Sequence, residues 1–96
     1  KALRDLYDRF KERIPSGVLA LGAVQGEKVF LLVGVTQDLT ARLHAGNLIK
    51  EIVKVVGGSG GGRPDMAQAG GSQPENLQGA LDLAARLVRE QLSQVG

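Results

Sequence analysis

Arg63 lies between two clusters of glycine and has the clearest chemical role of any side chain in this sequence. Seven of the fifteen residues in segment 57–71 (GGSGGGRPDMAQAGG) are glycine, half of the 14 in the chain. Consecutive backbone N–H groups at angles that glycine readily adopts form a nest for an anion. A neighbouring guanidinium adds a planar, bidentate donor for a phosphate or a base edge. The segment therefore predicts an anion-binding site made by the glycine run, the arginine and two nearby lysines: Gly60, Gly61, Gly62, Arg63, Lys50 and Lys54.

Two more specific nucleotide-binding motifs do not fit this segment. Residues 57–62 have the glycine spacing of a P-loop, but Arg63 and Pro64 occupy the places of its lysine and its serine or threonine. No three of these glycines have the GxGxxG spacing of a dinucleotide-binding fold. Two structural interpretations stay open: a glycine-rich linker without a ligand, and a local turn in which Asp65 bonds its own backbone.

The other polar residues predict neither a catalytic set nor a metal site. His44 is the only histidine, the chain has no cysteine, and no carboxylate stands beside His44 at metal-ligand spacing. The serines fall in turns or at helix ends, without the pattern of a triad: Ser16, Ser59, Ser72 and Ser93. Carboxylates of the first helix are interleaved with arginines, which predicts ion pairs within the helix: Asp5, Asp8 and Glu12 with Arg4, Arg9 and Arg13.

The composition is that of one small globular domain. The 96 residues carry a formal charge of +2 and are 43% hydrophobic, so neither general disorder nor a strong basic field is expected. The absence of cysteine agrees with a cytoplasmic location. The longest apolar run, residues 29–33, is too short to cross a membrane, and no signal peptide is visible. Because Lys1 already lies in a helical pattern, we expect a piece of a longer protein.

Hydrophobic periodicity divides the first half of the chain into a helix and two strands. Apolar residues at helical spacing predict a helix that ends at Pro15: Leu3, Leu6, Tyr7, Phe10 and Ile14. Residues 18–24 and 27–35 have the pattern of a hairpin joined at Gln25 and Gly26. The second strand is apolar at nearly every position from 29 to 35, which indicates a central strand covered on both faces.

The second half predicts two more helices around the glycine-rich segment. After a loop over 36–43, a helix carries the apolar residues of 48–56 and ends at Gly57. Ser72 and Glu75 form a capping box for a final helix, with Pro74 in its first turn. Residues 66–69 are a candidate short strand. The fold class is therefore α/β (α+β): a small sheet with an apolar central strand, covered by about three helices, with a glycine-rich loop before the last helix.

The segment GGGRPDMAQAGG closely resembles the glycine-rich signature of the C-terminal, DHH-associated domain of bacterial alanyl-tRNA synthetases. VTQDLTAR at 35–42, followed by Ala45, Gly46 and Leu48, resembles the part that precedes this signature in the family. The resemblance covers residues 3–92. By this likeness residues 1–14 are the end of a helical connector, and residues 15–96 are the C-terminal globular domain.

The resemblance implies a function in tRNA binding. Domains of this kind contact the outer corner of tRNA, where the D and T loops meet, and help to pair subunits, in support of aminoacylation and editing. The expected partners are tRNA(Ala), the other domains of the same synthetase and a second copy, with the glycine run, Arg63, Lys50 and Lys54 as the RNA-binding residues. The chain alone is not expected to be an enzyme, because ATP, magnesium and zinc belong to other parts of an alanine–tRNA ligase. With three aromatic residues, recognition is expected through phosphates and shape rather than base stacking.

Two other functions stay open. DHH-type phosphoesterases have a related glycine-rich end domain that holds the substrate, although they usually carry histidine where this chain has Arg63. A purely structural dimerisation cap is the third possibility. An HxxxH motif in the preceding part of the protein would favour the synthetase, and Asp-His-His would favour the phosphoesterase.

Overall fold

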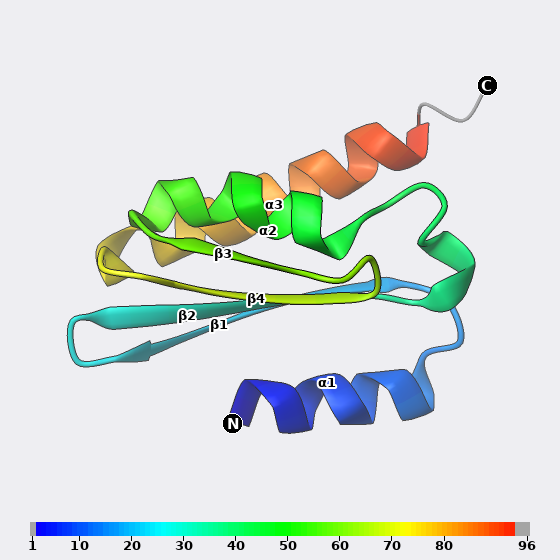
Figure 1. The fold of residues 1–96 in the computed structure, drawn as a ribbon, viewed down its shortest axis with the longest axis horizontal. Coiled ribbons are helices and arrows are strands. Elements are labelled where there is room, and N and C mark those ends of the chain that lie inside the picture. The colour runs from blue at the N-terminus through cyan, green and yellow to red at the C-terminus, as the bar shows by residue number, and fades with distance from the viewer. Residues whose placement is uncertain (1, 94–96) are drawn as a thin grey trace.

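The structure is a four-stranded antiparallel sheet with helices on both faces (Figure 1). It is a computed structural model, and it describes residues 2–93. The elements in chain order are α1 (Ala2–Arg13), β1 (Val18–Gln25), β2 (Lys28–Val35), α2 (Ala45–Ile52), β3 (Ser59–Gly62), β4 (Met66–Gly71) and α3 (Leu77–Ser93). The strand order is β1-β2-β4-β3, with α1 against one face of the sheet and α2 and α3 against the other. This arrangement confirms the predicted α+β class.

The strand β2 is central, as its apolar sequence predicts. It pairs with β1 through a hairpin that turns at Gly26, whose φ of 63° is in the left-handed region that glycine tolerates. On its other side β2 pairs with β4. Residues 31–35 are all buried, because helices cover both faces of the sheet at this end.

The main hydrophobic core lies between the sheet and the two helices α2 and α3. Its largest fully buried side chains include Leu31 of β2 and Ile49 of α2. Helix α3 approaches through small residues, since Ala80 and Ala84 are its buried positions. Its larger apolar side chains, including Leu81, are only partly buried and pack against the margin of the core.

Helix α1 is held to the opposite face of the sheet by one aromatic side chain. Tyr7 is 3% exposed and lies directly over Gly34 of β2. A Cβ atom added at Gly34 would lie 2.6 Å from Tyr7 Cε1, so the glycine makes room for the ring. The Tyr7 hydroxyl also donates a long hydrogen bond of 3.5 Å to the carbonyl oxygen of Asp65, in the turn between β3 and β4.

The ends of the helices agree with the sequence in one place and differ in another. Gly57, with φ of 66°, ends the single-turn 3-10 extension of α2 (Val53–Val56), as predicted. The predicted capping box before α3 is wrong. Gln73 is the N-cap residue of a 3-10 turn (Pro74–Asn76) and makes no side-chain cap, whereas the Ser72 hydroxyl donates to the carbonyl of Gly57 at 3.4 Å. The predicted loop over 36–43 contains another short 3-10 helix (Gln37–Leu39). Among the described helices, none is long and apolar enough to cross a membrane.

Candidate nucleic-acid interface

The glycine-rich segment is a β-hairpin, and the prediction of a loop is wrong for most of it. Residues 59–62 form the edge strand β3, which pairs with β4 in the register Gly60 to Ala69 and Gly62 to Ala67. The candidate strand at residues 66–69 is confirmed as part of β4. A run of glycine has low β-propensity and no alternating side chains, so the sequence alone gives a loop signal here.

Glycine is required in β3 because the strand lies unusually close to β4. A Cβ atom at Gly60 would lie 2.5 Å from Ala69 Cα, and one at Gly62 would lie 2.6 Å from Ala67 Cα. Gly61 is different, since its added Cβ would meet only Lys50 Cε, at 3.7 Å. Among the described glycines only Gly26 and Gly57 have positive φ. The predicted anion nest, which needs left-handed angles in the glycine run, is therefore wrong.

The turn that follows β3 caps helix α2. The backbone N–H of Ala45 donates to the carbonyl of Pro64 at 2.9 Å, and that of Gly46 donates to the carbonyl of Arg63 at 3.2 Å. His44 completes the cap, because its Nδ1 accepts a hydrogen bond of 3.2 Å from the N–H of Asn47. The first amide groups of this helix are thus already bonded within the protein. His44 is partly exposed and lies at the start of a helix, as predicted.

The structure brings part of the predicted binding set to one edge of the sheet. Arg63 follows β3, and its side chain is 68% exposed, with Nε 3.6 Å from Asp65 Oδ1. The stem of Lys50 reaches over Gly61 from α2. Lys54 lies one helical turn beyond Lys50 and pairs with Glu51 at 3.3 Å across exposed side chains. Three cations and two carboxylates leave this glycine edge with a local charge of +1.

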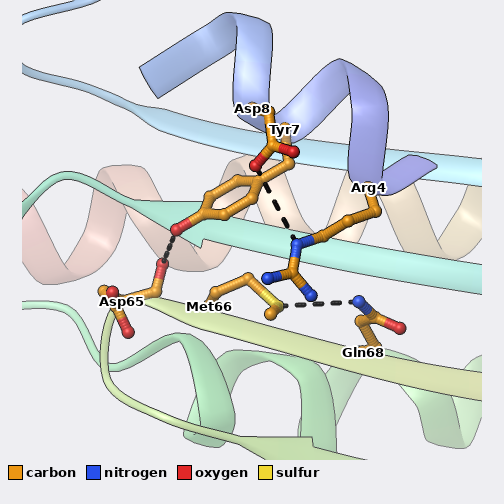
Figure 2. A network of polar contacts seen from close by, with 6 residues as sticks. All are labelled: Arg4, Tyr7, Asp8, Asp65, Met66 and Gln68. Carbon is orange, nitrogen blue, oxygen red and sulfur yellow. Dashed lines mark hydrogen bonds and ion pairs between the residues drawn. The ribbon is translucent and has the colours of Figure 1, made fainter. Parts of the chain in front are cut away.

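Sequence reasoning missed a second group of polar residues on the α1 side of the sheet. Figure 2 shows Arg4 extending from α1 across β2 toward Met66 and Gln68 of β4. Its Nε is 3.9 Å from Asp8 Oδ1, one of the ion pairs within α1 that the sequence predicts. The distance between Arg4 and Gln68 in the chain hides this proximity. The only sequence signal was the polar Gln68 between the apolar residues of β4.

The described residues contain no group of three or more histidines, cysteines or acidic residues that could hold a metal ion. Two titrating groups are perturbed, and both shifts have structural causes. Burial raises the pKa of Tyr7, with the Asp65 carboxylate as a second cause. Hydrogen bonds from the hydroxyls of Ser16 and Thr36 lower the pKa of the exposed Asp38. The bond from Ser16 also links the segment before β1 to the turn after β2.

The described part of the chain is thus a small α+β domain with a glycine-lined edge that carries Arg63, Lys50 and Lys54. Comparison with known proteins gives its family. The family model described as the DHHA1 domain matches residues 1–90, and the chain belongs to this family.

Relatives and a solved structure agree with this assignment. The chain is 59% identical over 93 residues to the alanine–tRNA ligase of Anaeromyxobacter dehalogenans (97% of this chain, 10% of that protein). It is 60% identical over 82 residues to that of Pseudoalteromonas translucida (85% and 9%). It thus spans about a tenth of the length of these curated relatives. The crystal structure of the C-Ala domain from Aquifex aeolicus alanyl-tRNA synthetase has a TM-score of 0.80 and 34% identity, covering 95% of this chain and 78% of that one.

Proposed function

We propose that this chain is the tRNA-binding module of an alanine–tRNA ligase and that its glycine edge contacts phosphates at the outer corner of the tRNA. The observation that carries the proposal is that Gly61, the one position of the run whose surface is open, lies beside the stem of Lys50 and lines the same shallow depression as Arg63. Relatives that bear the name alanine–tRNA ligase match nearly the whole chain at 50–60% identity, which supports the parent enzyme.

The geometry suits a phosphate backbone better than a small ligand. The strand β3 presents no bulky side chain, and alternate residues of an edge strand direct N–H and C=O groups away from the sheet. The ion pair of Lys54 with Glu51 is exposed, and such pairs contribute only about 0–1 kcal/mol, whereas in the pair of Arg63 with Asp65 the carboxylate is only 24% exposed. A phosphate can therefore replace Glu51 at little cost. Arg63 pairs with Asp65 through Nε, so its other N–H donors can contact a phosphate while this pair is kept.

Binding by so few cations has to be weak and sensitive to salt. If Lys50, Lys54 and Arg63 each neutralise one phosphate, log K falls with log salt with a slope of about −2.7. Raising the salt from 50 to 200 mM then weakens binding by roughly 40-fold. Phosphate contacts carry no sequence information directly, so this edge is expected to discriminate the shape of tRNA rather than its anticodon.

The test compares Arg63→Ala with Arg86→Ala, a matched arginine on α3. Both side chains are about two-thirds exposed (68% and 65%), and both pair with a carboxylate, at 3.6 and 3.8 Å. We expect Arg63→Ala to weaken binding of a tRNA(Ala) transcript several-fold and to reduce the salt slope by about 1. Arg86→Ala should bind as the parent does, and both variants should melt normally. Equal binding by Arg63→Ala and the parent at low salt would contradict the proposal.

Pairing of two copies is the second part of the proposed function. The outer edge of β1 has no partner strand among the described residues, and an apolar groove of about 520 Å³ runs beside it. Its lining includes Val18, Ala20, Leu81 and Val88. A second copy would cover both the edge and the groove. Sedimentation equilibrium over a range of concentrations measures this association, and a monomer at high micromolar concentration would argue against it.

A further inference from the structure

A depression on the α1 side of the sheet contains the most exposed aromatic ring of the described chain. Phe30 is 39% exposed, whereas Tyr7 is buried and Phe10 is half-buried. The depression has a volume of about 440 Å³, and it opens beside the first turn of α1. Its polar lining is Arg4, Gln25 and Gln68, and no acidic residue lines it.

The floor beside Phe30 is flat because its neighbours across the sheet are small. Phe30 pairs with Ala23 on β1 and with Gly70 on β4. A Cβ atom at Gly70 would lie 3.9 Å from Phe30 Cδ1, so the ring borders a surface that has no side chain there. The side of the ring toward Gly70 therefore has room for a planar group.

The depression is continuous with the glycine edge. Gly61 pairs with Gln68, which lines the depression, and the stem of Lys50 lies over Gly61. Gly61 on β3 is two strand spacings from Phe30 on β2 and is offset by two residues along the strands, which gives a separation of about 12 Å. A nucleic acid whose phosphate lies at Lys50 can therefore reach Phe30 with a neighbouring base.

We propose that this depression receives an exposed nucleobase of the bound RNA, which stacks on Phe30 while Arg4 and Gln68 contact its edge. This inference rests on the proposed function, and it adds a stacking site to the phosphate contacts of the glycine edge. Aromatic rings hold bases through their π-faces, and arginine adds a cation above the base. Figure 2 shows the Arg4 guanidinium and the Gln68 amide at the same border of β4. The Gln68 amide donates only one weak bond, of 3.8 Å to Met66 Sδ, so it keeps donor and acceptor capacity for a base.

The chemistry of the lining favours a base over an apolar protein segment. Two amide side chains and a guanidinium surround one ring, and amides can donate and accept at a base edge. Arg4 is the one charged residue that lines the depression, and because its partner Asp8 is not part of the lining, no carboxylate there repels a polyanion. A contact with another protein chain is the competing occupant, and the test below separates the two.

The experiment uses Phe30→Leu, which removes the aromatic face, and Phe30→Trp, which keeps it. Because the chain has no tryptophan, Phe30→Trp also introduces a single indole whose fluorescence can be followed. We expect Phe30→Leu to weaken tRNA binding by about 5- to 100-fold, the range of one base stack, with the salt slope unchanged. Phe30→Trp should bind within about threefold of the parent, and its emission should change when tRNA is added. Leu6→Ala, a change at another exposed apolar residue (46%), is the control and should bind normally.

The outcomes separate this inference from the function on which it rests. Normal tRNA binding by Phe30→Leu, while Arg63→Ala still reduces affinity and salt slope, would overturn the stacking site and leave the proposed function intact. A parent chain without salt-dependent tRNA binding would refute both. If Phe30→Leu changes only self-association, measured by sedimentation, the depression is a protein contact and the inference fails. Thermal melting of each variant shows whether a loss of binding reflects unfolding.

Discussion

Alanine substitution at neighbouring glycines of β3 should have opposite consequences for stability. At Gly60 the new Cβ would lie 2.5 Å from Ala69 Cα and 2.6 Å from the carbonyl oxygen of Gln68, both of which are backbone atoms. The two strands would have to separate, and overpacking of this kind costs about 1–3 kcal/mol or more. At Gly61 the new Cβ meets only the flexible end of Lys50, at 3.7 Å, which is an ordinary contact.

Neither glycine has a positive φ, so backbone strain does not enter the comparison. Gly61→Ala also removes freedom from the unfolded chain, which stabilises by about 0.4–1 kcal/mol at a compatible site. The two variants should therefore differ by about 1.5–4 kcal/mol. For a domain of this size each kcal/mol shifts Tm by roughly 4–8 °C, so Gly60→Ala should melt clearly below Gly61→Ala.

Urea unfolding followed by circular dichroism at 222 nm measures both free energies, and equal m-values show that the comparison is valid. Gly62→Ala is a second clashing variant, because its Cβ would lie 2.6 Å from Ala67 Cα. Equal loss of stability at Gly60 and Gly61 would refute the argument from close approach. Such a result would mean that the glycines are needed for their backbone angles and not for the close approach of the two strands.

Two further changes test the core and one surface network. Leu31→Ala should destabilise the fold by about 2–5 kcal/mol, because the side chain is 1% exposed. Leu81 is only partly buried at the margin of the core, so Leu81→Ala should destabilise clearly less in the same urea titration. Equal losses of stability would contradict the difference in burial. The hydroxyls of Ser16 and Thr36 hold the pKa of Asp38 below its ordinary value of 3.8 in the folded state. The ionised Asp38 carboxylate therefore stabilises the folded state fully above about pH 4, and this stabilisation is lost as the pH falls through the folded pKa. Asp38→Asn should therefore flatten the acid end of the curve of Tm against pH, and an unchanged curve would contradict the assignment.

Much of the fold could be predicted because its signals are local. The unbroken apolar run in β2 requires cover on both faces, and Gly57 supplies the left-handed residue that ends a helix. Strand β3 could not be predicted in the same way, because its stability comes from a partner strand with small residues at Ala67 and Ala69. The capping box failed for a related reason. The chain reaches α3 through a 3-10 turn, and the Ser72 hydroxyl is drawn to the carbonyl of Gly57.

The candidate site follows the same division between local and distant information. That Arg63 is special could be predicted from its glycine neighbours, but the approach of Lys50 to Gly61 depends on how α2 packs beside β3. The exposure of Phe30 also depends on the fold. The alternation of residues along β2 shows that Phe30 faces the α1 side of the sheet, but it does not show which part of this face α1 leaves uncovered. Binding of RNA by Gly60, Gly61, Gly62, Arg63, Lys50 and Lys54 stays a prediction.

The capped terminus of α2 limits how strongly this domain can bind an anion. The amides of Ala45 and Gly46 are bonded to the turn that carries Arg63, so no backbone nest adds to the side-chain charges. With a local charge of +1 at the glycine edge, an affinity near 100 μM would be typical of nonspecific contacts. A module tethered by a short linker acts at an effective concentration of about 1 mM, so even this affinity would strengthen tRNA binding by a larger enzyme about tenfold. The proposed function therefore predicts that the parent and Arg63→Ala differ by no more than about tenfold in the tethered enzyme at low salt, and that this difference shrinks as the salt concentration rises.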